Sequence, residues 1–224
     1  MADRLSNTQI DRLGRRLQSD PISDDDLRML DEFRRTYAEA FGTVVRRLHE
    51  LGFQPTCRSK TNDSIIGKMR RGDLKLLSQM QDVAGCRVIV PNVVDQDRTV
   101  IAVSSAFPGA RIVDRRSNPR NGYRAVHVIP KTDGRTVEIQ LRTELQHLWA
   151  ELSEAYSLAD PSIKYGGGSD DVRSMLSTSS ETIASSERMS LPEYEKFRDD
   201  LAKSFQNAIV RVLQEQGAKR RAKE

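Results

Sequence analysis

The spacing of hydrophobic residues changes along the chain and separates helical segments from extended ones. Towards both ends these residues recur every three or four positions, which is the period of an amphipathic helix. In the middle they form short runs of Val, Ile and Ala bounded by Gly, Pro and Asp, which is typical of strands. The pattern predicts helices over residues 5–17, 23–52, 64–72, 95–106, 143–158, 170–189 and from 190 onward. It predicts strands over residues 80–91, 110–113, 124–130 and 136–141.

The last two of these strands are joined by a segment that favours a tight turn. The joining residues 131–135 contain the pair Asp133-Gly134, which is a strong signal for a β-hairpin. On the second strand the period of two puts apolar side chains on one face and polar side chains on the other. The apolar set is Val137, Ile139 and Leu141, and the polar set is Glu138, Gln140 and Arg142. The polar face is either a solvated surface or part of a binding site.

Length and composition favour one core with helical extensions. The chain has 224 residues, of which 37% are hydrophobic and 30% are charged, so a sizeable core is possible beneath a highly charged surface. No apolar run approaches the roughly 20 residues that cross a bilayer, and we expect a cytoplasmic protein without a membrane partner. The net charge is 36 − 32 = +4, which suits a polyphosphate or nucleic-acid partner without requiring one. Cys57 and Cys86 are the only cysteines and lack the spacing of a zinc site, so we expect both to be reduced.

A basic segment precedes the first buried strand. Arg58 and Lys60 lie two apart on an extended stretch and share a face, and Ser64 and Lys68 lie four apart on the helix that follows. That helix begins after a Thr-Asn pair that suits an N-cap. Because backbone N–H groups at a helix N-terminus favour phosphate, the segment is either a cationic phosphate pocket or a solvated basic helix.

Asp82 and Arg87 interrupt the otherwise apolar strand over residues 80–91. A carboxylate at the mouth of a buried strand is costly unless it is paired or bound to a metal ion. We therefore expect Asp82 either to pair with an arginine or to hold a cation.

A second cluster of polar residues lies at the approach to the hairpin. An Asn-Gly turn there is surrounded by arginines and followed by an aromatic residue and a histidine. The cluster consists of Arg115, Arg116, Arg120, Asn121, Tyr123, Arg124 and His127. Cations and an aromatic ring, together with the carboxylate of Glu138, are the parts of a nucleotide site. Further on, His147 and Glu151 lie four apart on a helix, and we expect a side-chain pair rather than a metal site because a third ligand is lacking.

Five short motifs follow one another through the middle of the chain. They are Arg58-x-Lys60-x-x-x-Ser64-x-x-x-Lys68, Asp82 within QDVAGCRVIV, Asn121-Gly-Tyr-Arg-Ala-Val-His127, Glu138 within VEIQLRT, and Gln146-His-Leu-Trp-Ala-Glu151. In this order and spacing they resemble the synthetase domain of the RelA/SpoT family, over roughly residues 50–165. The resemblance implies an α+β fold with a mixed sheet flanked by helices, related to nucleotidyltransferases. Together with the hydrophobic pattern, it divides the chain into N-terminal helices at 1–52, a synthetase core at 53–165, and C-terminal helices with a basic tail at 166–224.

The resemblance implies an ATP-dependent pyrophosphokinase. Such an enzyme carries the β,γ-pyrophosphate of ATP to the ribose 3′-hydroxyl of GDP or GTP, which gives (p)ppGpp and AMP. By position, Asp82 and Glu138 are the implied catalytic residues and the ligands of Mg²⁺. The implied ATP-binding residues are Arg58, Lys60, Ser64, Lys68 and Arg87. The implied acceptor-binding residues are Arg120, Asn121, Tyr123, Arg124, His127 and Gln140, with Tyr123 stacking on the base.

The identity of the acceptor stays open. Members of the family that use GDP or GTP usually carry a tyrosine after an aspartate such as Asp114 and a lysine at the position of Arg120, whereas this chain has Arg115 and Arg120. A toxin-type member would instead pyrophosphorylate the 3′ end of tRNA or make adenosine alarmones, and a non-catalytic nucleotide- or RNA-binding module is a third interpretation. The resemblance also allows a homo-oligomer or an antitoxin partner bound through the C-terminal helices. The chain contains no His-Asp dipeptide, so the hydrolase motif of the family is missing.

Overall fold

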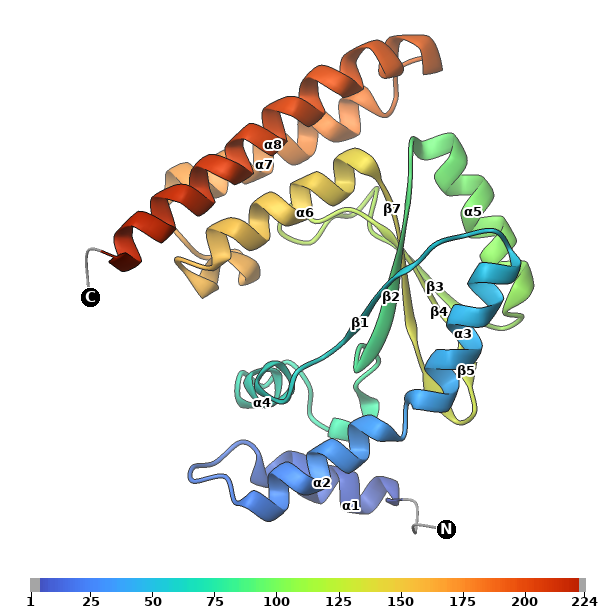
Figure 1. The fold of residues 1–224 in the computed structure, drawn as a ribbon, viewed down its shortest axis with the longest axis vertical. Coiled ribbons are helices and arrows are strands. Elements are labelled where there is room, and N and C mark those ends of the chain that lie inside the picture. The colour runs from blue at the N-terminus through green and yellow to red at the C-terminus, as the bar shows by residue number, and fades with distance from the viewer. Residues whose placement is uncertain (1–4, 222–224) are drawn as a thin grey trace. The chain divides into compact units, whose positions relative to one another are not determined.

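The computed structural model describes residues 5–221 and confirms the α+β fold class that the sequence predicts (Figure 1). Five strands form one mixed sheet in the order β1-β2-β7-β4-β3, and β5 and β6 form a two-stranded ribbon. The strands are β1 (Thr56–Ser59), β2 (Ala84–Val90), β3 (Arg111–Asp114), β4 (Val126–Ile129), β5 (Lys131–Thr132), β6 (Arg135–Thr136) and β7 (Glu138–Thr143). The α-helices are α1 (Asn7–Arg16), α2 (Asp24–Arg35), α3 (Ala38–Glu50), α4 (Asn62–Arg70), α5 (Val93–Ala106), α6 (Glu144–Ser157), α7 (Asp170–Ser186) and α8 (Leu191–Arg221). Two 3₁₀-helices are η1 (Leu77–Gln79) and η2 (Pro161–Tyr165).

The chain divides into two compact units, both of which include residues of the sheet. Unit 1 comprises residues 1–88, 102–112 and 128–140, and unit 2 comprises residues 89–101, 113–127 and 141–224. Unit 1 contains the basic segment and both predicted catalytic acids. Unit 2 contains the Asn-Gly turn and the C-terminal helices.

The helical N-terminal part of unit 1 has a break that the hydrophobic pattern does not reveal. The single helix expected over residues 23–52 is wrong, because α2 ends before Thr36 and α3 begins after Tyr37. The Thr36 hydroxyl donates to the Phe33 carbonyl at 2.6 Å, and the buried Tyr37 donates from its hydroxyl to the Met80 carbonyl at 3.2 Å. The break is therefore stabilised by a contact with a residue far away in the sequence.

Helix α4 begins at Asn62, two residues before the predicted start, and its N-cap comes from the predicted Thr-Asn pair. Thr61 is its N-cap and accepts a hydrogen bond from the backbone N–H of Ser64 at 3.3 Å. Apolar residues on one side of α4 are buried in the core of unit 1. Ser64 and Lys68 lie on the part of the helix that remains partly exposed.

The predicted hairpin turn is confirmed. Asp133 and Gly134 connect β5 to β6 with φ angles of 50° and 75°, so both residues are left-handed. Two successive left-handed residues are what a type I′ turn requires, and an Asp-Gly pair adopts them at low cost.

Helices α6, α7 and α8 form the core of unit 2. The Thr143 hydroxyl accepts from the Gln146 backbone N–H at the start of α6, and the Gln146 side chain accepts from the Thr143 N–H, so the predicted cap is confirmed. Trp149 on α6 is buried, and its indole N–H donates to the Leu176 carbonyl on α7 at 2.9 Å. Helix α8 extends to Arg221, and the end of the predicted basic tail lies outside the described residues.

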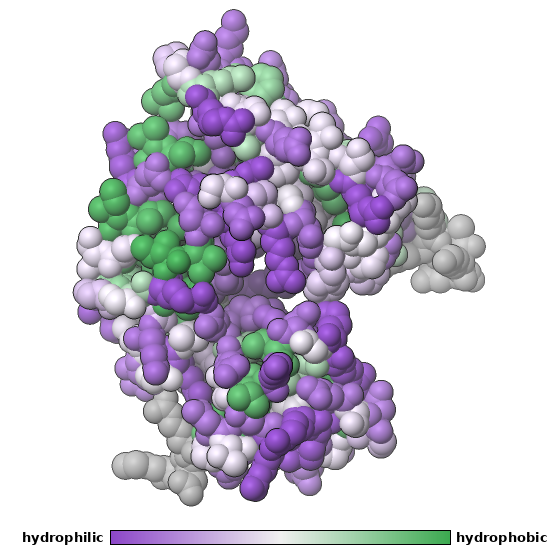
Figure 2. All heavy atoms as spheres, turned by 180° about the vertical axis from the view of Figure 1, so that it is seen from behind, coloured by the Kyte–Doolittle hydropathy of each residue, from purple (hydrophilic) through white to green (hydrophobic). Residues whose placement is uncertain are grey.

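The face of the molecule seen in Figure 2 is mostly hydrophilic, with hydrophobic side chains gathered in a few patches. Over residues 5–221, no helix is both long and apolar enough to cross a membrane. Both observations follow from the high proportion of charged residues in the helices.

Candidate active site

Asp82 in unit 1 lies between two lysines. Lys60, which directly follows β1, donates from Nζ to Oδ2 at 2.7 Å, and Lys68 on α4 donates to Oδ1 at 3.0 Å and to Oδ2 at 3.1 Å. The strand ladder positions Lys60, because its backbone N–H donates to the Val83 carbonyl at 2.8 Å. The sequence predicts that Asp82 pairs with an arginine or holds a bound cation, and the structure shows two lysines beside it instead.

The surroundings of Asp82 keep its carboxylate charged. Burial acts to raise the pKa of Asp82, but the charges of Lys60 and Lys68 and their hydrogen bonds outweigh it, so the pKa lies below the ordinary value of 3.8. The Asp82 side chain is still 26% exposed. An ionised carboxylate that is partly exposed can coordinate a divalent cation.

One face of the strands in unit 1 carries further residues that are predicted to bind ATP. β1 and β2 pair antiparallel with Arg58 opposite Gly85, and residues two apart on a strand share a face, so Arg58, Lys60 and Arg87 lie on the same side. A Cβ built on Gly85 would lie 3.6 Å from the Cβ of Glu138, which places Glu138 of β7 on this side as well. We call this side the polar face of unit 1.

Gln140 orients the second predicted acid. Its Nε2 donates to Oε2 of Glu138 at 2.9 Å, and Ile139 between them is fully buried, as the period of two requires. The resemblance assigns Gln140 to acceptor binding, which stays a prediction, and in the structure its amide also donates to Glu138.

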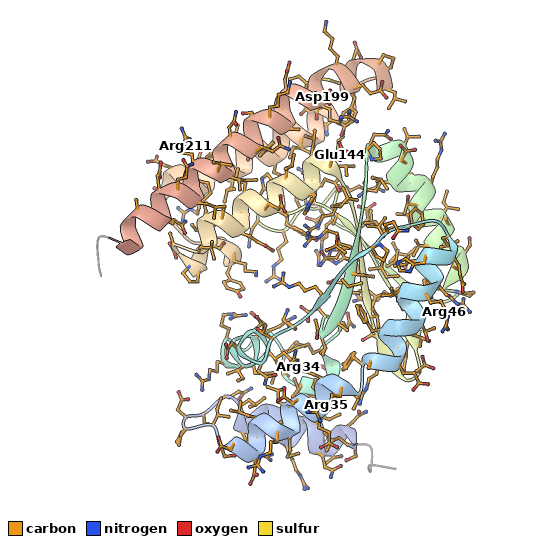
Figure 3. The ribbon with its side chains drawn as sticks, in the orientation of Figure 1. Arg34, Arg35, Arg46, Glu144, Asp199 and Arg211 are labelled. Carbon is orange, nitrogen blue, oxygen red and sulfur yellow. The ribbon has the colours of Figure 1, made fainter. Side chains whose placement is uncertain are left out.

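The start of α4 is tied to α2 by a network that the sequence pattern does not predict. Arg34, which Figure 3 labels on α2, donates from Nη1 to Oδ1 of Asn62 and to Oδ1 of Asp31, both at 3.1 Å. Asn62 in turn donates to Oδ1 of Asp31 at 3.0 Å. Because α4 carries Ser64 and Lys68, this network helps to position two of the predicted ATP-binding residues.

Arg135 is a second supporting residue that the sequence does not single out. It is 9% exposed, and its guanidinium carbon lies 5.3 Å from the ring centroid of Tyr37 and 5.6 Å from that of Phe33. Burial raises the pKa of Tyr37 to about 12, with Arg135 opposing the rise and Asp82 adding to it. Tyr37 is therefore a neutral hydroxyl donor within electrostatic reach of Asp82.

In unit 2 the Asn-Gly turn leads into Tyr123. Asn121 and Gly122 have φ angles of 52° and 84°, so both are left-handed, and glycine suits the second position because it has no Cβ. The Tyr123 N–H donates to the Arg120 carbonyl at 3.0 Å and closes the turn. The turn thus fixes where the chain delivers the Tyr123 side chain.

The Tyr123 ring is held by two partners in unit 2. Its hydroxyl lies 2.9 Å from Nε2 of His127 and accepts from Nη2 of Arg142 at 3.0 Å. The guanidinium carbon of Arg142 also lies 5.0 Å from the ring centroid. The ring is only partly buried, so its orientation is set while part of its surface stays accessible. Arg142 is buried, and its role could be read only from this contact.

Two arginines of the polar cluster around the Asn-Gly turn make contacts within unit 2. Arg116 donates to Asp114 at 2.7 Å and to Asp97 at 2.6 Å, and the hydrogen bonding to Asp114 is the main cause of its raised pKa. Arg124 donates from Nε to Oγ of Ser180 on α7 at 2.9 Å and from Nη1 to the Arg116 carbonyl. The charge of Arg116 is therefore matched by two carboxylates, and Arg124 ties the turn to α7.

Metal binding by protein ligands alone finds no support in the part of the chain that the structure describes. There, no group of three or more His, Cys, Asp or Glu side chains could hold an ion. His147 and Glu151 form the expected pair, with Nε2 and Oε1 separated by 3.3 Å. A divalent cation on the polar face would use Asp82 and Glu138 together with phosphate oxygens and water, which is the usual composition of a Mg²⁺ site.

The middle of the chain is similar to known proteins in sequence. The family profile described as "Region found in RelA / SpoT proteins" matches residues 57–159. Uncharacterized proteins of Mycobacterium bovis and Mycobacterium tuberculosis are each 39% identical to this chain over 116 residues, which is 50% of this chain and 41% of the relative. The match therefore spans only about two fifths of the length of these curated relatives.

The fold is similar to that of small alarmone synthetases. Small alarmone synthetase 1 from Bacillus subtilis has a TM-score of 0.57 and 23% identity, covering 78% of this chain and 98% of that one. The same protein bound to its product pppGpp has a TM-score of 0.55 and 25% identity, covering 77% and 97%. A GTP pyrophosphokinase family protein from Streptococcus pneumoniae has a TM-score of 0.53 and 22% identity, covering 79% and 96%.

Proposed function

From the match of residues 57–159 to the RelA/SpoT profile, we propose that the protein is an ATP-dependent pyrophosphokinase. The proposed reaction moves the β,γ-pyrophosphate of ATP to the ribose 3′-hydroxyl of GDP or GTP and yields AMP and (p)ppGpp. The observation that carries the proposal is the polar face of unit 1, where Lys60 and Lys68 converge on Asp82. The 25% identity to a small alarmone synthetase bound to pppGpp supports the same class of reaction.

The polar face of unit 1 supplies the charges that a triphosphate needs. Four cationic side chains come from β1, the residue directly after β1, β2 and α4, and they are Arg58, Lys60, Arg87 and Lys68 in that order. Phosphate oxygens are strong hydrogen-bond acceptors for such donors. Lys60 and Lys68 both donate to the Asp82 carboxylate. Both ammonium groups could therefore also contact the phosphates of an ATP molecule bound beside Asp82. Ser64, in the first turn of α4, adds a hydroxyl donor at a helix end that favours anions.

Asp82 and Glu138 are suited to hold Mg²⁺. Both offer hard carboxylate oxygens, and the lowered pKa of Asp82, which its two lysines bring about against the effect of burial, keeps it ionised. When bound, the ion would neutralise charge on the phosphates and so favour attack on them.

Glu138 is the proposed general base. It would accept the proton of the acceptor 3′-hydroxyl as that oxygen forms a bond to the β-phosphorus of ATP, while the bond from the β-phosphorus to the oxygen of AMP breaks. Gln140 donates to Oε2 of Glu138 and holds the carboxylate in one orientation. Orientation of this kind raises the rate because less motion has to be restricted during reaction.

Unit 2 supplies the proposed acceptor-binding residues. The ring of Tyr123 would stack on the base, and its contacts with His127 and Arg142 fix its orientation beforehand. Arg120 and Asn121 at the turn would meet the acceptor phosphates or sugar. Two carboxylates neutralise Arg116, and donors of Arg124 are engaged with Ser180 and a backbone carbonyl. Fewer cationic groups of unit 2 are therefore available to a long polyanion, which favours a mononucleotide over tRNA.

The test is a transfer assay with purified protein, ATP, Mg²⁺ and GDP or GTP, in which AMP and the pyrophosphorylated nucleotide are quantified. Glu138→Gln should lower the turnover at least about 100-fold, as expected for loss of a general base, with an unchanged melting temperature. The matched control is Glu50→Gln at the end of α3, where the side chain is 64% exposed, and it should keep the wild-type rate.

An unchanged rate in Glu138→Gln would remove the assigned role of this residue. Absence of transfer to any guanine nucleotide would remove the proposed substrate. Transfer to tRNA or to an adenosine nucleotide in the same assay would support the toxin-type alternative instead. Association through α8, which exposes Phe197, Val210 and Leu213, stays a prediction, as does the cytoplasmic location.

A further inference from the structure

The two cysteines of the chain are direct neighbours on adjacent strands of unit 1. In the antiparallel pairing of β1 with β2, Cys57 lies opposite Cys86. Lys60 and Val83 are a hydrogen-bonded pair, and hydrogen-bonded and non-hydrogen-bonded pairs alternate along such a ladder. Counting back three positions makes Cys57 and Cys86 a non-hydrogen-bonded pair, the type in which Cα atoms are only about 4.5 Å apart and side chains are closest.

This separation is compatible with a disulfide. Disulfides need Cα atoms roughly 4.4–6.8 Å apart and side chains on the same side of the backbone. Residues directly opposite each other in a sheet meet the second condition. Both thiols are free. Burial, followed by the charge of Cys57, raises the pKa of Cys86 to about 12.

The pair lies away from the proposed substrate-binding groups. Cys57 alternates with Arg58, and Cys86 lies between Gly85 and Arg87, so both thiols point to the side opposite the polar face. A bond there would join β1 to β2 without occupying the side on which Arg58 and Arg87 lie.

A small reagent can approach one of the two sulfurs. Cys57 is exposed, whereas Cys86 is only 3% exposed. Cys57 lines an open pocket of about 600 Å³ whose other side is formed by α3, with Phe41, Val45 and His49. Arg46 of the same helix, labelled in Figure 3, also lines it. An oxidant therefore has to react at Cys57 first.

We propose that Cys57 and Cys86 are a modification site at which a low-molecular-weight disulfide installs a reversible cross-strand disulfide. With glutathione disulfide, the Cys57 thiolate attacks one sulfur and releases one glutathione thiolate, which leaves a mixed disulfide on Cys57. The Cys86 thiolate then attacks the Cys57 sulfur and displaces the second glutathione. Two protein thiols are oxidised, one glutathione disulfide is reduced, and the two thiol protons end on the two glutathione molecules.

The bond would fix the edge of the sheet. β1 is the outermost strand next to β2, and it carries Arg58 and leads directly to Lys60. A cross-link closing the loop from residue 57 to residue 86 restricts the unfolded chain and should raise the melting temperature by roughly 5–15 °C. Oxidation would thus hold in place the strand that positions two proposed ATP contacts, and a thiol reductant would reverse it.

The test treats the full chain with glutathione disulfide and follows thiol count, intact mass and disulfide-linked peptides. Wild type should lose both thiols, lose the mass of two hydrogens and yield a peptide pair joined through Cys57 and Cys86, all reversed by dithiothreitol. Cys86→Ala should stop at a glutathione adduct on Cys57, and Cys57→Ser should leave Cys86 unmodified. Melting curves of each variant show that it is folded.

The decisive comparison is between wild type and Cys86→Ala. If wild type also stops at the adduct on Cys57 while Cys86 remains a titratable thiol after denaturation, the proposal is wrong. Cross-linking between two chains in place of the internal peptide pair would overturn it equally. Neither readout depends on catalytic activity, so the result is independent of the proposed function.

Discussion

Gly85 is the point at which a single methyl group should disturb Glu138. In the structure a Cβ built on Gly85 would lie 2.9 Å from the carbonyl oxygen of Glu138, whereas ordinary contacts start at 3.4 Å. The two strands would have to separate by about 3.4 − 2.9 = 0.5 Å, and the atom in the way is backbone, which cannot rotate aside. We therefore predict that Gly85→Ala destabilises unit 1 and displaces the proposed general base.

The size of the effect follows from two opposing terms. Insertion of a methyl group into a well-packed contact costs about 1–3 kcal/mol. Loss of glycine entropy in the unfolded chain offsets about 0.4–1 kcal/mol of this. The net loss of about 1–2 kcal/mol should lower the melting temperature by roughly 2–8 °C in a chain of this length. The turnover number in the transfer assay should fall by more than the loss of folded protein accounts for, because small displacements of a reacting group lower the rate strongly.

Gly42 provides the matched control. It lies within α3, and a Cβ built there meets no atom within 4 Å. Gly42→Ala should raise the melting temperature by roughly 2–4 °C, since alanine favours a helix over glycine by about 1 kcal/mol, and should leave turnover unchanged. Thermal melts followed by circular dichroism compare the two variants. Equal melting temperatures and rates for Gly85→Ala and wild type would show that the space between Gly85 on β2 and the Glu138 carbonyl on β7 is wide enough for a methyl group.

Two further predictions concern unit 2. Gly122→Ala should cost about 2–4 kcal/mol, because φ is 84° and the new Cβ would lie 2.6 Å from Cζ2 of Trp149; an unchanged melting temperature would contradict this. Burial raises the pKa of Glu187 above 4.5 despite hydrogen bonds from Thr143 and Gln146, so its contribution to stability is present below pH 4.5 and is lost as pH rises through the folded-state pKa. Glu187→Gln does not titrate, so its melting temperature relative to wild type should increase as pH rises from 4.5 through the folded-state pKa of Glu187, and a constant difference would argue against a raised pKa.

Local signals in the sequence predict the elements well. Thr61 as the cap of α4, Thr143 as the cap of α6 and the Asp133-Gly134 turn depend on residues within a few positions of one another. Interactions of this range are set by backbone geometry and side-chain type, so the sequence contains them directly.

Long-range contacts are where sequence reasoning stops. The break at Tyr37 depends on Met80. Of the two lysines beside Asp82, one directly follows β1 and the other lies on α4. The stacking of Arg135 on Tyr37 likewise joins distant segments. No spacing or motif in the sequence predicts these pairings, because the tertiary fold creates them.

Strand register is a second quantity that the sequence does not contain. The sequence identifies Cys57 and Cys86 as the only cysteines, but it does not show that they face each other. A shift of one residue would reverse the side on which each thiol points. The same holds for Gly85 and Glu138, whose proximity becomes visible only once β2 and β7 are neighbours.

The most direct test of the central claim follows two labels on ATP in parallel reactions with Mg²⁺ and GDP. If the chain transfers pyrophosphate, label in the γ position should move to the acceptor, and label in the α position should be recovered only in AMP, in equal amount. Recovery of the γ label as inorganic phosphate, or transfer of the α label to the acceptor, would show hydrolysis or nucleotidyl transfer and would contradict the account.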